Sequence, residues 1–220
     1  MSWIEQYVQP GMTVLDIGAN HGSITNQLVQ AVGETGVVWA IEPHSDLAPE
    51  LRRYTPHVLS LAAGDRDGMT TLYLSRQYEH NSLYAANLNE ATGDSMAVRI
   101  AQLDTLQRCG ELPTPIDAIK IDAQGAEAAI VRGAQRLLRE QRPVVYFELW
   151  PVGLRTAGGD AAGLCAAFEA LDYRPDGRTW ADVLTDAENC RAFGSSIDVC
   201  CLSDEGVIDV VDGESNLDDC

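Results

Sequence analysis

Short runs of apolar residues alternate along this chain with segments in which apolar side chains recur at helical spacing. This alternation is typical of a parallel sheet that is covered by helices on both faces. One helical stripe contains Ile24, Leu28 and Val32, and similar stripes occur within 130–138 and 164–171. The predicted strands are 13–17, 37–41, 58–62, 118–121, 144–148 and 196–202, with a further candidate at 207–211.

The segment between the third and fourth predicted strands has a different pattern. Residues 70–74 and 97–103 alternate between apolar and polar side chains, as strands with one covered face do. We therefore predict a β-rich insertion over 69–105. A chain of 220 residues has the length of one domain. We predict that domain over 1–202 and an acidic tail over 203–220.

Residues 14–25 read VLDIGANHGSIT. Their pattern predicts a buried strand with Asp16 near its end, a turn that contains Gly18 and Gly22, and the start of a helix. Gly18 and Gly22 let the backbone pass close to a ligand, which the free amides of the following helix would face. The dinucleotide fingerprint needs three glycines spaced G-x-G-x-x-G, and this turn has two. Asp16 would repel a pyrophosphate, but it could accept hydrogen bonds from a cationic amino group. The turn therefore predicts an S-adenosylmethionine site, since that cofactor has such a group and no phosphate.

A second acid supports this interpretation. Glu42 follows the predicted strand 37–41 and lies 26 residues after Asp16. A carboxylate at the end of the second strand of a doubly wound sheet can accept hydrogen bonds from both ribose hydroxyls. The alternative is that both acids are solvated at strand ends. We predict cofactor contacts from Asp16, Gly18, Asn20, Gly22 and Glu42, with Ala63 and Gly64 near the adenine and Asp122 beside the reactive methyl group.

Six blocks of the sequence resemble the FkbM-type S-adenosylmethionine-dependent methyltransferases. They are LDIGANHG, AIEPH, LAAGDRDG, QLDTL, IKIDAQGAE and YFELWP, in that family's order, between residues 11 and 151. The resemblance implies a single-domain α/β fold of the Rossmann-like class I methyltransferase type. Its mostly parallel, doubly wound sheet would contain an antiparallel late strand, and the insertion would cap the substrate side. Family members usually have an acid where this chain has Gln124, which puts in doubt any role that needs a negative charge there.

The block AIKIDAQGAE, residues 118–127, is where we predict the chemistry. On a strand, Lys120 and Asp122 share one face, and Asp122 lies at the carboxyl end, where open α/β sheets bind ligands. Lys120 is the only lysine beside fourteen arginines, and we expect it to be buried and paired with Asp16 or Asp122. The pair could lock neighbouring strands or serve the reaction. Glu127 is predicted to be a first-turn helix acid.

Methyl transfer from a sulfonium mainly requires alignment of the acceptor, the methyl group and the sulfur. An alcohol acceptor also needs a base for its proton. The candidate catalytic residues are Asp122, His80, Glu148 and Lys120, while His44 could line the cofactor mouth or simply begin the next helix. Asp122 and Glu148 could also hold Mg²⁺. No D-D-N cluster follows Asp122 and the cysteines lack metal-ligand spacing, so we favour a site without a metal.

The net charge of −18 argues against nucleic acid and anionic membranes as partners, because both are bound through clustered Lys and Arg. Seven acidic residues and no basic one lie in 203–220, which is typical of a solvated end. The N-terminus has neither the basic start nor the apolar core of a signal peptide, and no apolar run has membrane-spanning length. We therefore expect a cytoplasmic protein.

Together these features predict an S-adenosylmethionine-dependent O-methyltransferase. The resemblance implies a small-molecule partner that offers the hydroxyl of a sugar or of a secondary metabolite in natural-product biosynthesis. Two other functions stay open. A nucleotide-dependent oxidoreductase could share the fold, and a cofactor-binding protein without activity could serve as an interaction module. The sequence makes no prediction of the oligomeric state.

Overall fold

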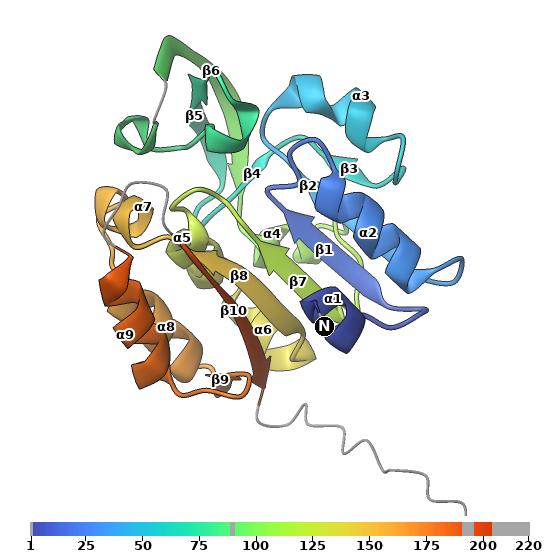
Figure 1. The fold of residues 1–220 in the computed structure, drawn as a ribbon. Coiled ribbons are helices and arrows are strands. Elements are labelled where there is room, and N and C mark those ends of the chain that lie inside the picture. The colour runs from blue at the N-terminus through green and yellow to red at the C-terminus, as the bar shows by residue number, and fades with distance from the viewer. Residues whose placement is uncertain (1, 89–90, 191–195, 204–220) are drawn as a thin grey trace, which may run out of the picture.

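The computed structural model describes residues 2–88, 91–190 and 196–203, and in these ranges the strands form one large and one small sheet. The large sheet has the strand order β3-β2-β1-β7-β8-β10-β9 (Figure 1). β3, β2, β1, β7 and β8 are parallel, whereas β10 is antiparallel to both β8 and β9. The bounds are β1 Thr13–Ile17, β2 Val37–Ile41, β3 Val58–Leu59, β7 Ala118–Ile121, β8 Val144–Leu149, β9 Tyr173–Pro175 and β10 Ile197–Ser203.

Helices cover both faces of this sheet because alternate side chains of each strand point to opposite faces. Val14 and Ala118 pack under α1 (Trp3–Tyr7) and α2 (Ser23–Val32). Leu15 and Ile119 contribute to the larger core on the opposite face. The helices of that face are α4 Leu103–Arg108, α5 Glu127–Arg132, α6 Gln135–Gln141, α8 Ala161–Glu169 and α9 Trp180–Asn189. The two short helices α3 (Ala48–Leu51) and α7 (Pro151–Thr156) follow β2 and β8 in the chain.

The insertion, residues 68–101, stands over the carboxyl ends of the parallel strands (Figure 1). Its strands β5 (Gly68–Ser75) and β6 (Ala91–Ala101) are antiparallel and form the small sheet with β4 (Ala62–Ala63). Leu72, Val98 and Ile100 provide its small apolar core. Three short 3₁₀ turns complete the described elements: η1 Ser45–Leu47, η2 Tyr78–His80 and η3 Ala85–Asn87. The predicted β-rich insertion after the third strand is confirmed.

The predicted α/β class, with a doubly wound, mostly parallel sheet and a late antiparallel strand, is also confirmed. The prediction of one strand over 58–62 is wrong. The amide of Leu61 donates to the Leu59 carbonyl, so the chain leaves the large sheet there and β4 joins the small sheet instead. The candidate strand at 207–211, like nearly all of the acidic tail, lies outside the described residues.

The helical stripe over 130–138 is two helices, α5 and α6, rather than one. They are separated at Gly133, where an added Cβ would lie 1.9 Å from the Gly64 carbonyl oxygen. Gly133 therefore permits a close approach of two backbone segments. Neither α1 nor the edge strand β9 was predicted. Among the helices that the structure describes, none is long and apolar enough to cross a membrane.

Candidate active site

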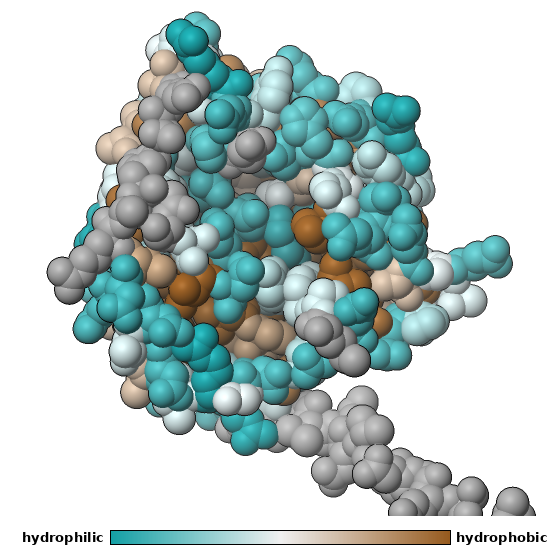
Figure 2. Space-filling model, viewed as in Figure 1, coloured by the Kyte–Doolittle hydropathy of each residue, from teal (hydrophilic) through white to brown (hydrophobic). Residues whose placement is uncertain are grey.

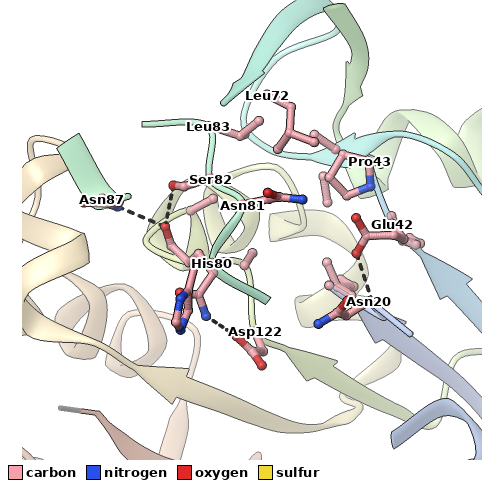
Figure 3. Close-up of a pocket in the computed structure, with 18 of the residues that line it drawn as sticks. Asn20, Glu42, Pro43, Leu72, His80, Asn81, Ser82, Leu83, Asn87 and Asp122 are labelled. Carbon is pink, nitrogen blue, oxygen red and sulfur yellow. Dashed lines mark hydrogen bonds between the residues drawn. The ribbon is translucent and has the colours of Figure 1, made fainter. Parts of the chain in front are cut away.

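A cavity of about 380 Å³ lies at the carboxyl ends of β1, β2, β7 and β8, beneath the insertion. We name two sides of it. The β1–β2 side contains Ile17, Gly18, Asn20, Ile41, Glu42 and Pro43; the β7–β8 side contains Asp122, Ala123, Gln124, Glu148, Trp150 and Ser196. Figure 3 shows Glu42 and Asn20 across the cavity from Asp122, with Leu72 and Leu83 of the insertion above. The outer surface seen in Figure 2 is largely hydrophilic, with smaller hydrophobic areas near its middle.

The glycine turn brings the backbone against the loop after β7. Gly18 has φ +73°, and an added Cβ would lie 1.7 Å from the Asp122 carbonyl oxygen, so only glycine fits there. Gly18 and Asn20 line the cavity, as Ala63 does. Gly22 and Gly64 are predicted cofactor residues that do not line it. Gly22 lies at the start of α2, and Gly64 packs against Gly133 in the break between α5 and α6.

Glu42 is fixed by backbone amides on the β1–β2 side. Its Oε2 accepts a hydrogen bond from the Asn20 amide at 2.9 Å, and its Oε1 accepts one from the His44 amide at 2.9 Å. Burial raises the pKa of Glu42, which the two amides partly offset. Each carboxylate oxygen keeps further acceptor capacity for a ligand. Sequence reasoning placed Glu42 at this strand end, and the structure places its side chain in the cavity wall.

Asp16 and Lys120 lie beneath this wall on paired positions of β1 and β7, and neither lines the cavity. The Asp16 carboxylate accepts a hydrogen bond from the Thr25 hydroxyl at 2.6 Å and lies 3.3 Å from Lys120 Nζ. Lys120 Nζ is also 3.7 Å from Asp122 Oδ2 and donates to the Gly18 carbonyl at 2.8 Å. The expected burial and pairing of Lys120 are therefore present.

Lys120 keeps its positive charge in the fold. Burial alone would lower the pKa of Lys120, but Asp16 and Asp122 outweigh that effect and raise it, so the ammonium stays charged. Because Asp16 is fully buried and already bound by Thr25 and Lys120, the structure places it behind the cavity rather than in it.

On the β7–β8 side, two carboxylates are joined by one amide. Gln124 Nε2 donates to Asp122 Oδ1 at 3.0 Å and to Glu148 Oε2 at 3.3 Å. The other Glu148 oxygen accepts a hydrogen bond from the Ser196 hydroxyl at 2.7 Å. Burial and the neighbouring Asp122 charge raise the pKa of Glu148 to about 7. This side therefore offers a carboxyl group that can gain or lose a proton near neutral pH.

Glu127 is the first residue of α5, as predicted, and it does not line the cavity. It is fully buried, and its Oε1 accepts hydrogen bonds from the amides of Ala123 at 2.9 Å and Gly125 at 3.2 Å. Burial raises the pKa of Glu127 to about 7. Its role in the fold is to hold the loop that carries Gln124.

Of the histidines, His80, from the insertion, lines the cavity and the others do not. His44 is buried at the start of η1, as the alternative reading of that residue expected. His21 is exposed and lies 2.7 Å from Glu50. Within the described residues, no group of three His, Cys, Asp or Glu side chains is arranged to hold a metal ion.

Sequence reasoning missed several cavity residues that come from distant segments. Ser82 and Asn87 of the insertion both donate to the Gln124 carbonyl, at 2.9 and 3.0 Å, as the converging dashed lines in Figure 3 show. Trp150 and Ser196 also line the cavity. Trp150 lies two residues after Glu148, so proximity in the sequence could have indicated it. No comparable pattern marks Ser82, Asn87 or Ser196.

Comparison with known proteins identifies the family of this chain. The model of the methyltransferase FkbM domain matches residues 16–175. Among solved structures, the FkbM methyltransferase of Methylobacillus flagellatus matches with a TM-score of 0.52 and 18% identity, over 78% of this chain and 45% of that one. This chain thus spans less than half of that protein.

Two further solved structures have the same fold. A putative rRNA methylase of Clostridium thermocellum matches with a TM-score of 0.51 and 11% identity, over 91% of this chain and 92% of that one. The fibrillarin pre-rRNA processing protein of Methanococcus jannaschii matches with 0.51 and 10%, over 89% and 68%. No protein of curated function matches. Since the family model covers most of the chain, the chain belongs to the FkbM family of S-adenosylmethionine-dependent methyltransferases.

Proposed function

We propose that this protein transfers a methyl group from S-adenosylmethionine to a hydroxyl of a small molecule, a sugar or a secondary metabolite. The observation that carries the proposal is the arrangement of carboxylates across one cavity. Glu42 is held by backbone amides on the β1–β2 side, and Asp122 and Glu148 lie together on the β7–β8 side. The first arrangement suits a ribose, and the second suits the transfer of a proton.

The residues of the cavity fit the cofactor. Glu42 can accept hydrogen bonds from both ribose hydroxyls while its other lone pairs hold the Asn20 and His44 amides. Gly18 lets the cofactor approach the backbone, and the predicted roles of Ala63 near the adenine and Asp122 near the methyl group agree with their places in the wall. Asp16 would act indirectly, because it pairs with Lys120, which in turn contacts the Gly18 carbonyl and Asp122.

When bound, S-adenosylmethionine supplies an electrophilic methyl group whose carbon–sulfur bond breaks with its electron pair going to sulfur. The protein's part is to align the acceptor oxygen with that methyl carbon, which can supply about 7–11 kcal/mol of the barrier. The hydroxyl proton then passes to Asp122 or Glu148, since both carboxylates line the cavity. Lys120, which does not line the cavity, lies with its Nζ 3.7 Å from Asp122 Oδ2.

A neutral hydroxyl compound suits the lining best. Glu42, Asp122 and Glu148 line the cavity, and none of its described lining residues is Lys or Arg. Amide and hydroxyl groups at Asn81 and Ser82, together with the aromatic ring of Trp150, can contact a polyol and its apolar face. This composition, like the net charge of −18, disfavours a phosphorylated acceptor or RNA.

Two measurements test the proposal. Calorimetry with S-adenosylmethionine and S-adenosylhomocysteine should give one binding site per chain. Incubation with methyl-labelled cofactor and a panel of neutral glycosides and polyketide alcohols should then transfer label to an oxygen, identified by mass spectrometry. Amines and an RNA transcript form the comparison arms of the panel. Absence of cofactor binding would sink the proposal, and transfer to an amine or to RNA alone would refute its acceptor class.

A further inference from the structure

Gln124 is the point at which the insertion meets the carboxylates of the β7–β8 side. Its backbone carbonyl accepts hydrogen bonds from Ser82 and Asn87 of the insertion. Its side-chain amide donates to Asp122 and Glu148 at the ends of adjacent strands. Its φ is +49°, a conformation that few residues other than glycine adopt. One residue thus makes four hydrogen bonds, to the insertion, to β8 and to Asp122 in its own loop.

The loop around Gln124 is fixed by other groups as well. Glu127 binds the amides of Ala123 and Gly125 from the helix side. At Gly125, an added Cβ would lie 2.5 Å from Asn87 Nδ2 and 2.8 Å from the Gly153 carbonyl oxygen, so neighbouring atoms pack closely there. The path of the backbone is therefore held by groups other than the Gln124 side chain as well. We expect the loop to stay in place when the amide is removed.

The chemistry of a primary amide suits a pair of carboxylates. Two carboxylates at neighbouring strand ends repel each other, and a shared proton, a cation or hydrogen-bond donors can relieve that repulsion. The Gln124 NH₂ group has two hydrogens and no charge, so it can serve both acceptors without binding a counter-ion. An acid at the same position would place a third negative group against Asp122 and Glu148.

We propose that Gln124 is a positioning residue: its amide holds Asp122 and Glu148 side by side at the cavity so that the pair can receive one proton from the acceptor. This inference rests on the proposed function. Burial and the neighbouring Asp122 raise the pKa of Glu148, so the two carboxyls that Gln124 joins are close enough to share one proton. The titratable groups around this carboxyl are Asp122, Glu127, His80, Tyr146 and Asp198, with Lys120 behind Asp122.

The test measures proton affinity directly and needs no acceptor. Glutamate side-chain carboxyl carbons are labelled with ¹³C, and the Glu148 signal is assigned by its loss in Glu148→Gln. Gln124→Met keeps the length of the side chain and removes both donors, so the upper titration step of the pair should rise by about one pH unit. Gln124→Glu adds a negative charge, and its rise should be larger.

Gln141→Met is the matched control. The Gln141 amide also makes partly buried hydrogen bonds, to the Gln107 side chain at 2.8 Å and from the Ile116 amide at 2.8 Å, but it does not line the cavity. A purely structural effect of losing an amide would appear in this variant as lowered stability with an unchanged Glu148 titration.

Wild-type titration of Glu148 in both folded Gln124 variants would overturn the inference. Calorimetry with S-adenosylmethionine on the same samples separates it from the proposed function. Gln124→Met should still bind the cofactor, since Glu42 and the glycine turn are untouched and the substitution adds no charge. If wild-type protein does not bind the cofactor, the proposed function fails while the titration result for Gln124 stands by itself.

Discussion

On the β1–β2 side of the cavity, Glu42 is held by the backbone amides of Asn20 and His44. On the β7–β8 side, Glu148 is held by the side chains of Gln124 and Ser196, which come from different parts of the chain. The first arrangement survives most changes of side chain at positions 20 and 44, because the donors belong to the main chain. The second can be altered by one substitution at either partner.

This difference suits two tasks. A cofactor shared by many enzymes can be bound by a constant backbone frame, whereas an acceptor requires side chains whose positions and charges can vary. Lys120 lies between the two sides and contacts Asp16 of β1 and Asp122 after β7. Substitutions on the β1–β2 side should therefore change cofactor affinity, and substitutions on the β7–β8 side should change turnover. A change at Lys120 should destabilise the contacts between β1 and β7 that support both sides.

The largest separation is expected from Asp122→Asn. Asparagine keeps the shape and removes the charge that would help to take the acceptor proton, so kcat should fall by about 10²–10⁴-fold. Cofactor affinity should stay within a few-fold of wild type, as measured by calorimetry. Turnover at the wild-type rate in a folded Asp122→Asn protein would remove Asp122 from the proposed mechanism.

Lys120→Met tests the contacts of Lys120 that support both sides of the cavity. Methionine keeps an unbranched apolar stem and drops the charge, leaving Asp16 buried without its cation. Breaking a buried pair from one side costs about 3–5 kcal/mol, so urea denaturation should show a loss of that size. The control is Arg136→Met, which removes the exposed pair with Glu140 and should cost less than about 1 kcal/mol. Equal losses would mean that the buried Lys120–Asp16 pair contributes no more to stability than an exposed pair.

Glu42→Ala should have the opposite effect to Asp122→Asn, because it should lower cofactor affinity in particular. Loss of a carboxylate that accepts two ribose hydroxyls should weaken S-adenosylmethionine binding by at least about 100-fold, since hydrogen bonds to charged groups are worth about 1.5–3 kcal/mol each. Calorimetry measures this effect, and Glu50→Ala, at an exposed acid paired with His21, is the control. Unchanged affinity in the Glu42 variant would end the ribose assignment.

The sequence predicted the β1–β2 side more completely than the β7–β8 side. Gly18, Asn20 and Glu42 lie in continuous motifs at strand ends, where local rules of turn geometry and parallel topology place them in one cavity. Those rules failed at Asp16, whose carboxylate faces α2 and Lys120 instead of the cavity. A strand position defines a face of the sheet, but it does not say which layer a ligand can reach.

On the β7–β8 side, Asp122 and Glu148 could be placed at adjacent strand ends from the order of the strands alone. The groups that join them could not. Ser82, Asn87 and Ser196 reach the site through the path of the insertion and the approach to β10, which depends on long-range packing. Local periodicity likewise did not reveal that residues 58–63 divide between two sheets.

The smallest effect is expected in the pH dependence of stability, and it sharpens the comparison at Glu148 itself. An unfolded glutamate titrates near pH 4.5, whereas burial and Asp122 raise the pKa of folded Glu148 to about 7. The folded state therefore holds this proton more tightly, and the stability it provides is complete below about pH 4.5 and lost as the pH rises through 7. In Glu148→Gln, the substituted side chain cannot ionise. Between pH 5 and 8, the free energy of unfolding of this variant should therefore fall by roughly 1–2 kcal/mol less than that of wild type, a figure that is reduced because Glu148 is partly exposed.

Urea denaturation at pH 5 and pH 8 measures the difference. Glu111→Gln is the control, because Arg99 lowers the pKa of Glu111 and moves its contribution below this pH range. Parallel pH profiles for wild type and Glu148→Gln would show that Glu148 ionises in the fold as freely as in water.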